Sequence, residues 1–205
     1  MFEGRRALML RRSPHPFALA ASALLSLACD APGHGDDEAA CVAGAGDGSA
    51  ELDLPLAFAE GWRPTPAHTD PLVTHRPETV VCNLDAWGEE YGLFEVRTAG
   101  CNYLSVDQAL AESVSAGDTL AVELWWQALI AHEPATAHLA VLIDGALAWE
   151  LEVAVPGPSD ARRLEFVSPI DAEAGATVTF HLHNHGQNSW TLASLELVER
   201  AASCP

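Results

Sequence analysis

Residues 137–155 read AHLAVLIDGALAWELEVAV, and the pattern of this stretch decides the fold class. Asp144-Gly145 is a dipeptide typical of the two-residue turn of a β-hairpin. Along residues 147–155 apolar side chains alternate with Glu150 and Glu152, as in a strand with one face in a core. The stretch therefore predicts an antiparallel hairpin of residues 137–143 and 146–155.

Short segments elsewhere in the chain show similar strand signals. In residues 119–126, apolar side chains recur at every second position from Leu120 to Trp126. The remaining strand candidates are residues 52–58, 79–84, 93–97, 101–106, 164–167, 177–183 and 190–198. A helix is expected only over residues 106–114. About nine short strands separated by turn residues predict an all-β, antiparallel, jelly-roll-like β-sandwich over residues 51–205.

The composition sets limits on the partners. The chain has 205 residues, with 29 acidic and 10 basic side chains and a formal net charge of −19. Every basic residue is an arginine, so lysine chemistry is excluded. Such acidity argues against binding to nucleic acid and against electrostatic docking on anionic lipid. The hydrophobic content of 49% is enough for a folded core.

The N-terminus has the pattern of an export signal. Four arginines in residues 5–12 precede an apolar stretch, residues 17–28, that is too short to span a bilayer. This stretch ends in Leu25-Ser26-Leu27-Ala28-Cys29, which resembles the lipobox of bacterial lipoproteins. The resemblance implies cleavage of residues 1–28, a lipid on Cys29 and anchoring to a cell-envelope membrane, periplasmic or at the cell surface. The alternatives are cleavage near Ala28 to a fully secreted protein, and translation from Met9.

Residues 29–50 are rich in Gly, Ala and Asp, and we expect them to form a flexible, acidic tether. Beyond Cys29 the chain has an even number of cysteines, which suits an oxidising compartment. Four cysteines allow three pairings, of which we favour Cys82 with Cys101 and Cys41 with Cys204. No C-x-x-C spacing that would favour a cysteine metal site is present.

Two segments resemble each other within the chain. Residues 116–124, AGDTLAVEL, align with residues 174–182, AGATVTFHL. Such turn-then-strand units look like those of jelly-roll carbohydrate-binding modules and galactose-binding-like domains. The resemblance implies a sandwich that binds a sugar without catalysis. In the alignment Glu123 corresponds to His181, and Trp125 to His183.

We predict a ligand-binding face from these four positions. Exposed aromatic rings beside acids and amides suit sugars, whose C–H faces stack while their hydroxyl groups form hydrogen bonds. Trp126 and Trp149 are expected in the core, whereas Trp125 is either covered or a stacking platform. The predicted ligand-binding residues are Glu123, Trp125, His181, His183, Asn188 and Trp190.

The same histidines allow a second hypothesis. His181 and His183 share one face of a strand, and two such imidazoles can hold Zn or Cu if a third ligand is near. Third-ligand candidates are His138, Glu123, His185 and His132, with His138 preferred. Plain polar histidines on a solvent-facing strand are the alternative to a metal site.

No catalytic motif stands out: G-x-S-x-G, H-E-x-x-H and a glycine-rich phosphate loop are all missing. The leading prediction is a membrane-anchored, non-enzymatic, glycan-binding lipoprotein without a cofactor. The alternatives are a metal-binding protein or metalloenzyme, and a structural envelope-assembly protein with no small ligand.

Overall fold

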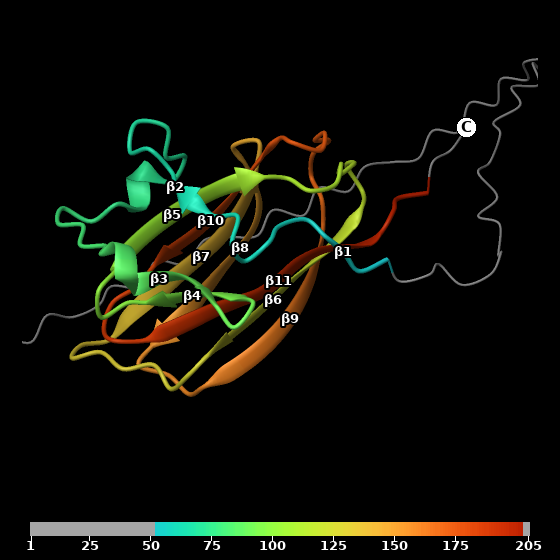
Figure 1. Cartoon of the computed structure of the whole chain (residues 1–205). Coiled ribbons are helices and arrows are strands. Elements are labelled where there is room, and N and C mark those ends of the chain that lie inside the picture. The colour runs from blue at the N-terminus through green and yellow to red at the C-terminus, as the bar shows by residue number, and fades with distance from the viewer. Residues whose placement is uncertain (1–51, 203–205) are drawn as a thin grey trace, which may run out of the picture. The chain divides into compact units, whose positions relative to one another are not determined.

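The computed structural model describes residues 52–202, which form two antiparallel β-sheets (Figure 1). Sheet A has the order β3 (Trp87–Glu90), β4 (Leu93–Arg97), β11 (Ser189–Glu199), β6 (Thr119–Trp126) and β9 (Asp160–Val167), and β1 (Leu54–Pro55) also pairs with β11. Sheet B has the order β2 (Arg63–Pro64), β5 (Tyr103–Ala109), β10 (Thr177–His183), β7 (Ala135–Ile143) and β8 (Ala146–Val155). Two 3₁₀ turns, η1 (Val73–His75) and η2 (Leu84–Ala86), complete the elements. Over this range no helix is long and apolar enough to cross a membrane.

The strand order is that of a jelly roll. From β4 onward the chain passes to the other sheet at every connection except the β7–β8 hairpin, which gives the sets β4-β11-β6-β9 and β5-β10-β7-β8. All strand pairs in the two sheets are antiparallel. The predicted all-β, antiparallel sandwich is therefore confirmed.

The core lies between the sheets and follows the alternation in the sequence. Leu120, Val122, Leu124 and Trp126 of β6 are all buried, as predicted. Trp190 of β11 lies in the same core, with its ring centroid 5.0 Å from that of Trp126. Because one face of each central strand is filled this way, functional groups on these strands have to use the outer faces.

The local turn chemistry also agrees with the sequence. Asp144 and Gly145 both have positive φ (49° and 77°), the conformation that a two-residue hairpin turn requires. The two similar segments both turn at a glycine of positive φ, Gly117 (97°) and Gly175 (91°), and Thr119 and Thr177 begin β6 and β10. The internal similarity therefore marks equivalent strands of the two sheets.

Two local predictions are wrong, and two short strands, β2 and β3, were missed. Residues 106–114 are not a helix, because β5 continues to Ala109 and Val106 pairs with both Phe180 and Pro64. Residues 79–84 are not a strand: this segment makes only an isolated bridge before η2. The short edge strand β3, with Gly88 in its middle, gives too weak an alternation to be recognised in the sequence.

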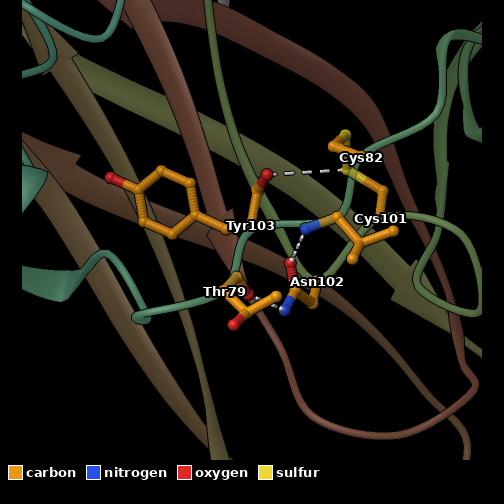
Figure 2. Close-up of a disulfide and its surroundings, with 6 residues drawn as sticks. Thr79, Cys82, Cys101, Asn102 and Tyr103 are labelled. Atoms are coloured by element: carbon orange, nitrogen blue, oxygen red, sulfur yellow. Dashed lines mark hydrogen bonds between the residues drawn. A yellow bond between two sulfur atoms is a disulfide. The ribbon is translucent and has the colours of Figure 1, made fainter.

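The disulfide between Cys82 and Cys101 is present, which confirms that prediction (Figure 2). Asn102 reinforces the bridge, because its Nδ2 donates to the carbonyl of Thr79 (3.0 Å) and its Oδ1 accepts from the amide of Val81 (2.9 Å). The segment before η2 is thereby fixed to the start of β5. Cys29, Cys41 and Cys204, the signal and the tether lie outside the described residues, so those predictions stay predictions.

Candidate functional site

The six predicted ligand-binding residues do not share one face. Glu123 and Trp125 alternate with the core residues of β6 and lie on the outer face of sheet A. His181 and His183 alternate with the core residues of β10 and lie on the outer face of sheet B. Equivalent strands of opposite sheets point their outer side chains in opposite directions, so the expected common face does not form.

Two further predicted residues are buried. Trp190 is 1% exposed and belongs to the core, so the interpretation of its ring as part of a binding rim is wrong. Asn188 is also buried, and its Oδ1 accepts from the amide of Ile130 (2.6 Å) while its Nδ2 donates to the carbonyl of His185 (3.1 Å). Asn188 therefore positions loops.

The histidines form a cluster under residues 65–81, a segment we call the strap. His75 of the strap stacks on His138 of β7, with ring centroids 4.3 Å apart. The ring centroid of His181 lies 5.5 Å from that of His138, and His183 pairs with His138 across the strands. The expected proximity of His138 to the two β10 histidines is thus found, but within residues 52–202 no three His, Cys, Asp or Glu side chains are arranged to hold a metal ion.

A buried hydrogen-bond chain connects the strap to this cluster. Asp70 accepts from the hydroxyl groups of Tyr103 (2.6 Å) and Ser105 (3.1 Å), and Ser105 Oγ lies 2.9 Å from Nδ1 of His181. Burial and then the neighbouring imidazoles His138 and His75 lower the pKa of His181 to about 3, so this ring is neutral. The chain thus holds the strap against the outer side chains of Ser105 and His181 on sheet B.

The outer face of sheet A, in contrast, carries one continuous cross-strand row. Trp125 of β6 pairs with Thr191 of β11, Thr191 pairs with Glu95 of β4, and Glu95 pairs with Gly88 of β3. We call these four residues the Trp125 row. Trp125 and Glu95 are half-buried, and Thr191 is only 1% exposed, with a hydroxyl group that has no hydrogen-bond partner among the described residues.

A depression of about 230 Å³ lies at the β3 end of this row. It is lined by Asp85, Trp87, Gly88, Glu89, Glu90, Glu95 and Arg97. Arg97 Nη1 lies 3.5 Å from Glu90 Oε2, and its guanidinium also donates to the carbonyl of Asp85. Burial raises the pKa of Glu95, and a hydrogen bond with Glu90 raises it further. Perturbed carboxyl groups in a depression are typical of functional sites.

Trp87 is the aromatic centre of this edge of the sandwich. Its half-buried ring packs on that of Phe94, with ring centroids 6.0 Å apart. Trp87 also lines two further depressions, of about 280 and 210 Å³. The larger of these also contains Glu60, Trp62 and Arg63. Because β3 pairs only with β4, its other edge leaves backbone groups without strand partners. Among the described residues this strand edge is thus free. Trp87 pairs with the core residue Val96, so its ring lies on the opposite side of β3 from Gly88 and Glu90.

A separate depression of about 380 Å³ lies where three loops meet at one end of the sandwich. It is lined by Thr98, Ala99, Ile130, Ala131, His132, Gly186 and Gln187. Thr98 and Asn188 connect the walls of this depression, because the backbone amide of Asn188 donates to Thr98 Oγ1 (2.9 Å). This depression has volume but no aromatic lining, so it is less suited to a sugar ring than the edge around Trp87.

Comparison with known proteins gives limited likeness. No family model matches the chain, and no curated protein matches it. Among solved structures, one described as "CBM4 structure and function" has a TM-score of 0.42 and 11% identity, covering 75% of this chain and 99% of that one. The N-terminal cellulose-binding domain of Cellulomonas fimi β-1,4-glucanase C has a TM-score of 0.39 and 14% identity, covering 61% and 90%. TmCBM61, solved with β-1,4-galactotriose, has a TM-score of 0.37 and 12% identity, covering 67% and 99%.

Sequence reasoning missed the residues at the sheet edge. Trp87 stands in WGEEYG, where a tryptophan, two glutamates and a Tyr-Gly turn follow one another within six residues. This local density of aromatic and acidic groups was the signal available. Its link to Trp125, however, depends on the pairing of β4 with β11, two strands nearly a hundred residues apart in the chain.

Proposed function

We propose that this protein is a non-catalytic, glycan-binding module whose site is the outer face of sheet A. The observation that carries the proposal is the Trp125 row, which joins half-buried Trp125 to the depression lined by Glu90 and Glu95. Trp125 supplies the apolar surface, and the carboxylates of Glu90 and Glu95 supply hydrogen-bond acceptors.

The spacing suits an oligosaccharide better than a single sugar. Trp125 and Gly88 lie three strands apart in one row, which at about 4.8 Å per strand separates them by roughly 14 Å. Between them lies Thr191, whose hydroxyl group is buried without a partner among the described residues. A sugar ring stacked on Trp125 would place the hydroxyl groups of the following rings beside the polar side chains of Glu95 and Glu90.

We further propose that the module is exported and anchored through a lipid on Cys29, with residues 29–50 as the tether. The lipobox-like residues 25–29 support this proposal. Metabolic labelling with a fatty-acid analogue tests it. Label on the intact protein that disappears in Cys29→Ser is expected, and an unlabelled, freely secreted product would contradict anchoring.

Isothermal titration with neutral and charged oligosaccharides tests the binding proposal. Trp125→Ala is expected to weaken binding at least about tenfold, since stacking on one ring contributes on the order of 1 kcal/mol or more. Leu147→Ala, an exposed apolar residue of sheet B, is the control and leaves the affinity unchanged. Binding that is indifferent to Trp125→Ala would contradict this site.

A metal-binding function is the second candidate, favoured by one observation. Nδ1 of His138 and Nε2 of His181 are buried and have no hydrogen-bond partner among the described residues. Elemental analysis before and after chelation, followed by reloading with zinc or copper, tests it. A stoichiometric metal that is lost in His181→Ala would support this function, and no metal under any loading would remove it.

A further inference from the structure

We propose that the depression of about 380 Å³ between the loops of residues 98–99, 130–132 and 186–187 binds the acetamido group of an N-acetylated sugar. This site is separate from the outer face of sheet A. The inference rests on the proposed glycan-binding function only in taking a sugar as the body of the ligand. It adds a substituent that the ring of Trp125 does not select.

The walls of the depression are fixed by buried hydrogen bonds. Thr98 Oγ1 accepts from the backbone amide of Asn188 and from Nδ2 of Asn184, both at 2.9 Å. Asn188 Oδ1 in turn accepts from the backbone amide of Ile130 (2.6 Å). Thr98, Asn184 and Asn188 are all buried, so water competes little with these bonds. Because the walls are already in place, a ligand does not have to order the loops when it binds.

A close contact between two of the loops completes the depression. Gly186 has a φ of 96°, and a Cβ at this position would lie 1.9 Å from the carbonyl oxygen of Ile130 and 3.2 Å from Cα of Ala131. The loops can approach this closely only because residue 186 has no side chain. The volume lies near the lower end of the range of about 300 to 1,000 Å³ that is typical of small-molecule sites. It therefore suits one sugar unit and its substituents.

The lining favours a neutral ligand. It contains no Asp, Glu or Arg, and its only ionisable side chain is that of His132. An ammonium group would find no carboxylate in the depression. An anion would find no arginine there and would be repelled by a protein of formal net charge −19.

Polar groups of the lining can both donate and accept hydrogen bonds. The backbone amides of Ala99, Ala131 and Gln187 donate to no acceptor among the described residues, and the carbonyl groups of Ala99 and Ala131 accept from none of them. The side-chain amide of Gln187 adds another donor and another acceptor. A neutral ligand matches this lining when it carries one donor and one acceptor side by side. The N–H and C=O groups of an acetamido substituent are such a pair.

The apolar part of the lining matches the methyl group of the same substituent. Ile130 is 56% exposed although it is a large apolar residue, and it lines the depression together with Ala99 and Ala131. A methyl group placed against these side chains removes apolar surface from water on both partners. Since the lining has no aromatic ring, the substituent and not the face of the sugar ring carries the recognition. Glucose lacks this methyl group, and glucosamine replaces it by a charge.

Saturation-transfer NMR and titration of the full-length protein test the inference, with N-acetylglucosamine, glucose and glucosamine as probes. The acetyl methyl protons are expected to receive the largest saturation. N-acetylglucosamine is expected to bind about tenfold more tightly than glucose, in line with one buried methyl group and one hydrogen bond. Ile130→Ser should weaken this binding several-fold. The control is Val167→Ser on β9, which removes an aliphatic side chain of similar exposure (62%) and should leave the affinity unchanged.

Equal affinities for N-acetylglucosamine and glucose would overturn the selection of the acetamido group. Equal losses in Ile130→Ser and Val167→Ser would also overturn the inference. Loss of binding in Trp125→Ala but not in Ile130→Ser would assign the sugar to sheet A, and would overturn this site while the glycan-binding function stands. Binding of N-acetylglucosamine that depends on Ile130, without binding of any oligosaccharide that depends on Trp125, would support this site and refute the one proposed on sheet A.

Discussion

Nδ1 of His181 lies 2.9 Å from Oγ of Ser105, while Nε2 of the same ring is buried without a hydrogen-bond partner among the described residues. Ser105 in turn donates to Asp70 of the strap, so its hydroxyl oxygen is placed to accept a hydrogen bond from the Nδ1–H group of the imidazole. A ring held in this way is stable only while it is neutral, because burial and neighbouring imidazoles disfavour its charge.

Acid should therefore destabilise the fold through His181. Its pKa falls from 6.5 to about 3 on folding, so the unfolded chain takes up the proton first, and stability is lost as the pH falls from 6.5 towards 3. The loss is at most about 1.4 kcal/mol per pH unit for one proton. Urea unfolding at several pH values measures this loss. His181→Gln should make the free energy of unfolding depend less steeply on pH, by the contribution of about one proton. His68→Gln, at an exposed position of the strap, should leave the slope as it is; an unchanged slope in His181→Gln would contradict this account.

Asp118 should be one of the most sensitive carboxylates for stability. Burial alone would raise the pKa of Asp118, but hydrogen bonds from the backbone of Ser115 and Ala201 and from Arg200 lower it overall. These contacts fix the end of β11 to the turn before β6. Asp118→Asn is expected to lower the free energy of unfolding by about 2 kcal/mol at neutral pH, and chemical denaturation measures this. A loss no larger than that of Glu112→Gln, an exposed control, would show that the contacts do not hold the chain end.

Gly186 and Gly175 form a matched pair for testing the loop contact at the end of the sandwich. Both have positive φ, 96° and 91°, but a Cβ on Gly186 would lie only 1.9 Å from the carbonyl oxygen of Ile130, whereas one on Gly175 would have nothing within 4 Å. Gly175→Ala should cost about 1 kcal/mol of strain, and Gly186→Ala clearly more. Thermal unfolding of the two variants compares them. Equal costs would mean that the loops of residues 130–131 and 186 separate easily.

Removal of the disulfide should loosen the strap. Cys82 and Cys101 are 19 positions apart, and closure of a loop of this size contributes about 3 kcal/mol. The double variant Cys82→Ser/Cys101→Ser is expected to lose up to that amount in urea unfolding. Because Asn102 still holds Thr79 and Val81, the loss in Asn102→Ala combined with the double variant should exceed that of the double variant alone. No additional loss would show that the two anchors do not act together.

Local patterns predicted the strands better than they predicted the site. The bounds of β4, β6, β8 and β10 follow from the alternation of apolar side chains, because each of these strands buries one face in the core. The edge strand β3 buries little and contains Gly88, so alternation gave no sign of it. Similarly, apolar residues in 106–114 suggested a helix, although Val106 and Ala109 belong to β5, where they pair with a strand that is distant in the sequence.

The site required tertiary information of another kind. The similarity of residues 116–124 and 174–182 correctly places Glu123 and His181 at equivalent positions, but equivalence in a sandwich means opposite sheets. The interpretation of one common face ignored this reversal. Trp190 and Asn188 illustrate a second limit, because a tryptophan or an asparagine near a loop has the same local sequence whether it faces ligand or core.

The direction of β11 has a consequence for the way the module is presented. This strand starts at Ser189 and ends at Glu199, and its 11 residues span roughly 35 Å. Leu52 donates its amide to the carbonyl of Val198, so any segment before Leu52 leaves the sandwich beside the far end of the strand. Thr191, and with it the Trp125 row, lies at the opposite end. The strand therefore separates Trp125 by most of the length of the sandwich from Leu52, the first residue that the structure describes.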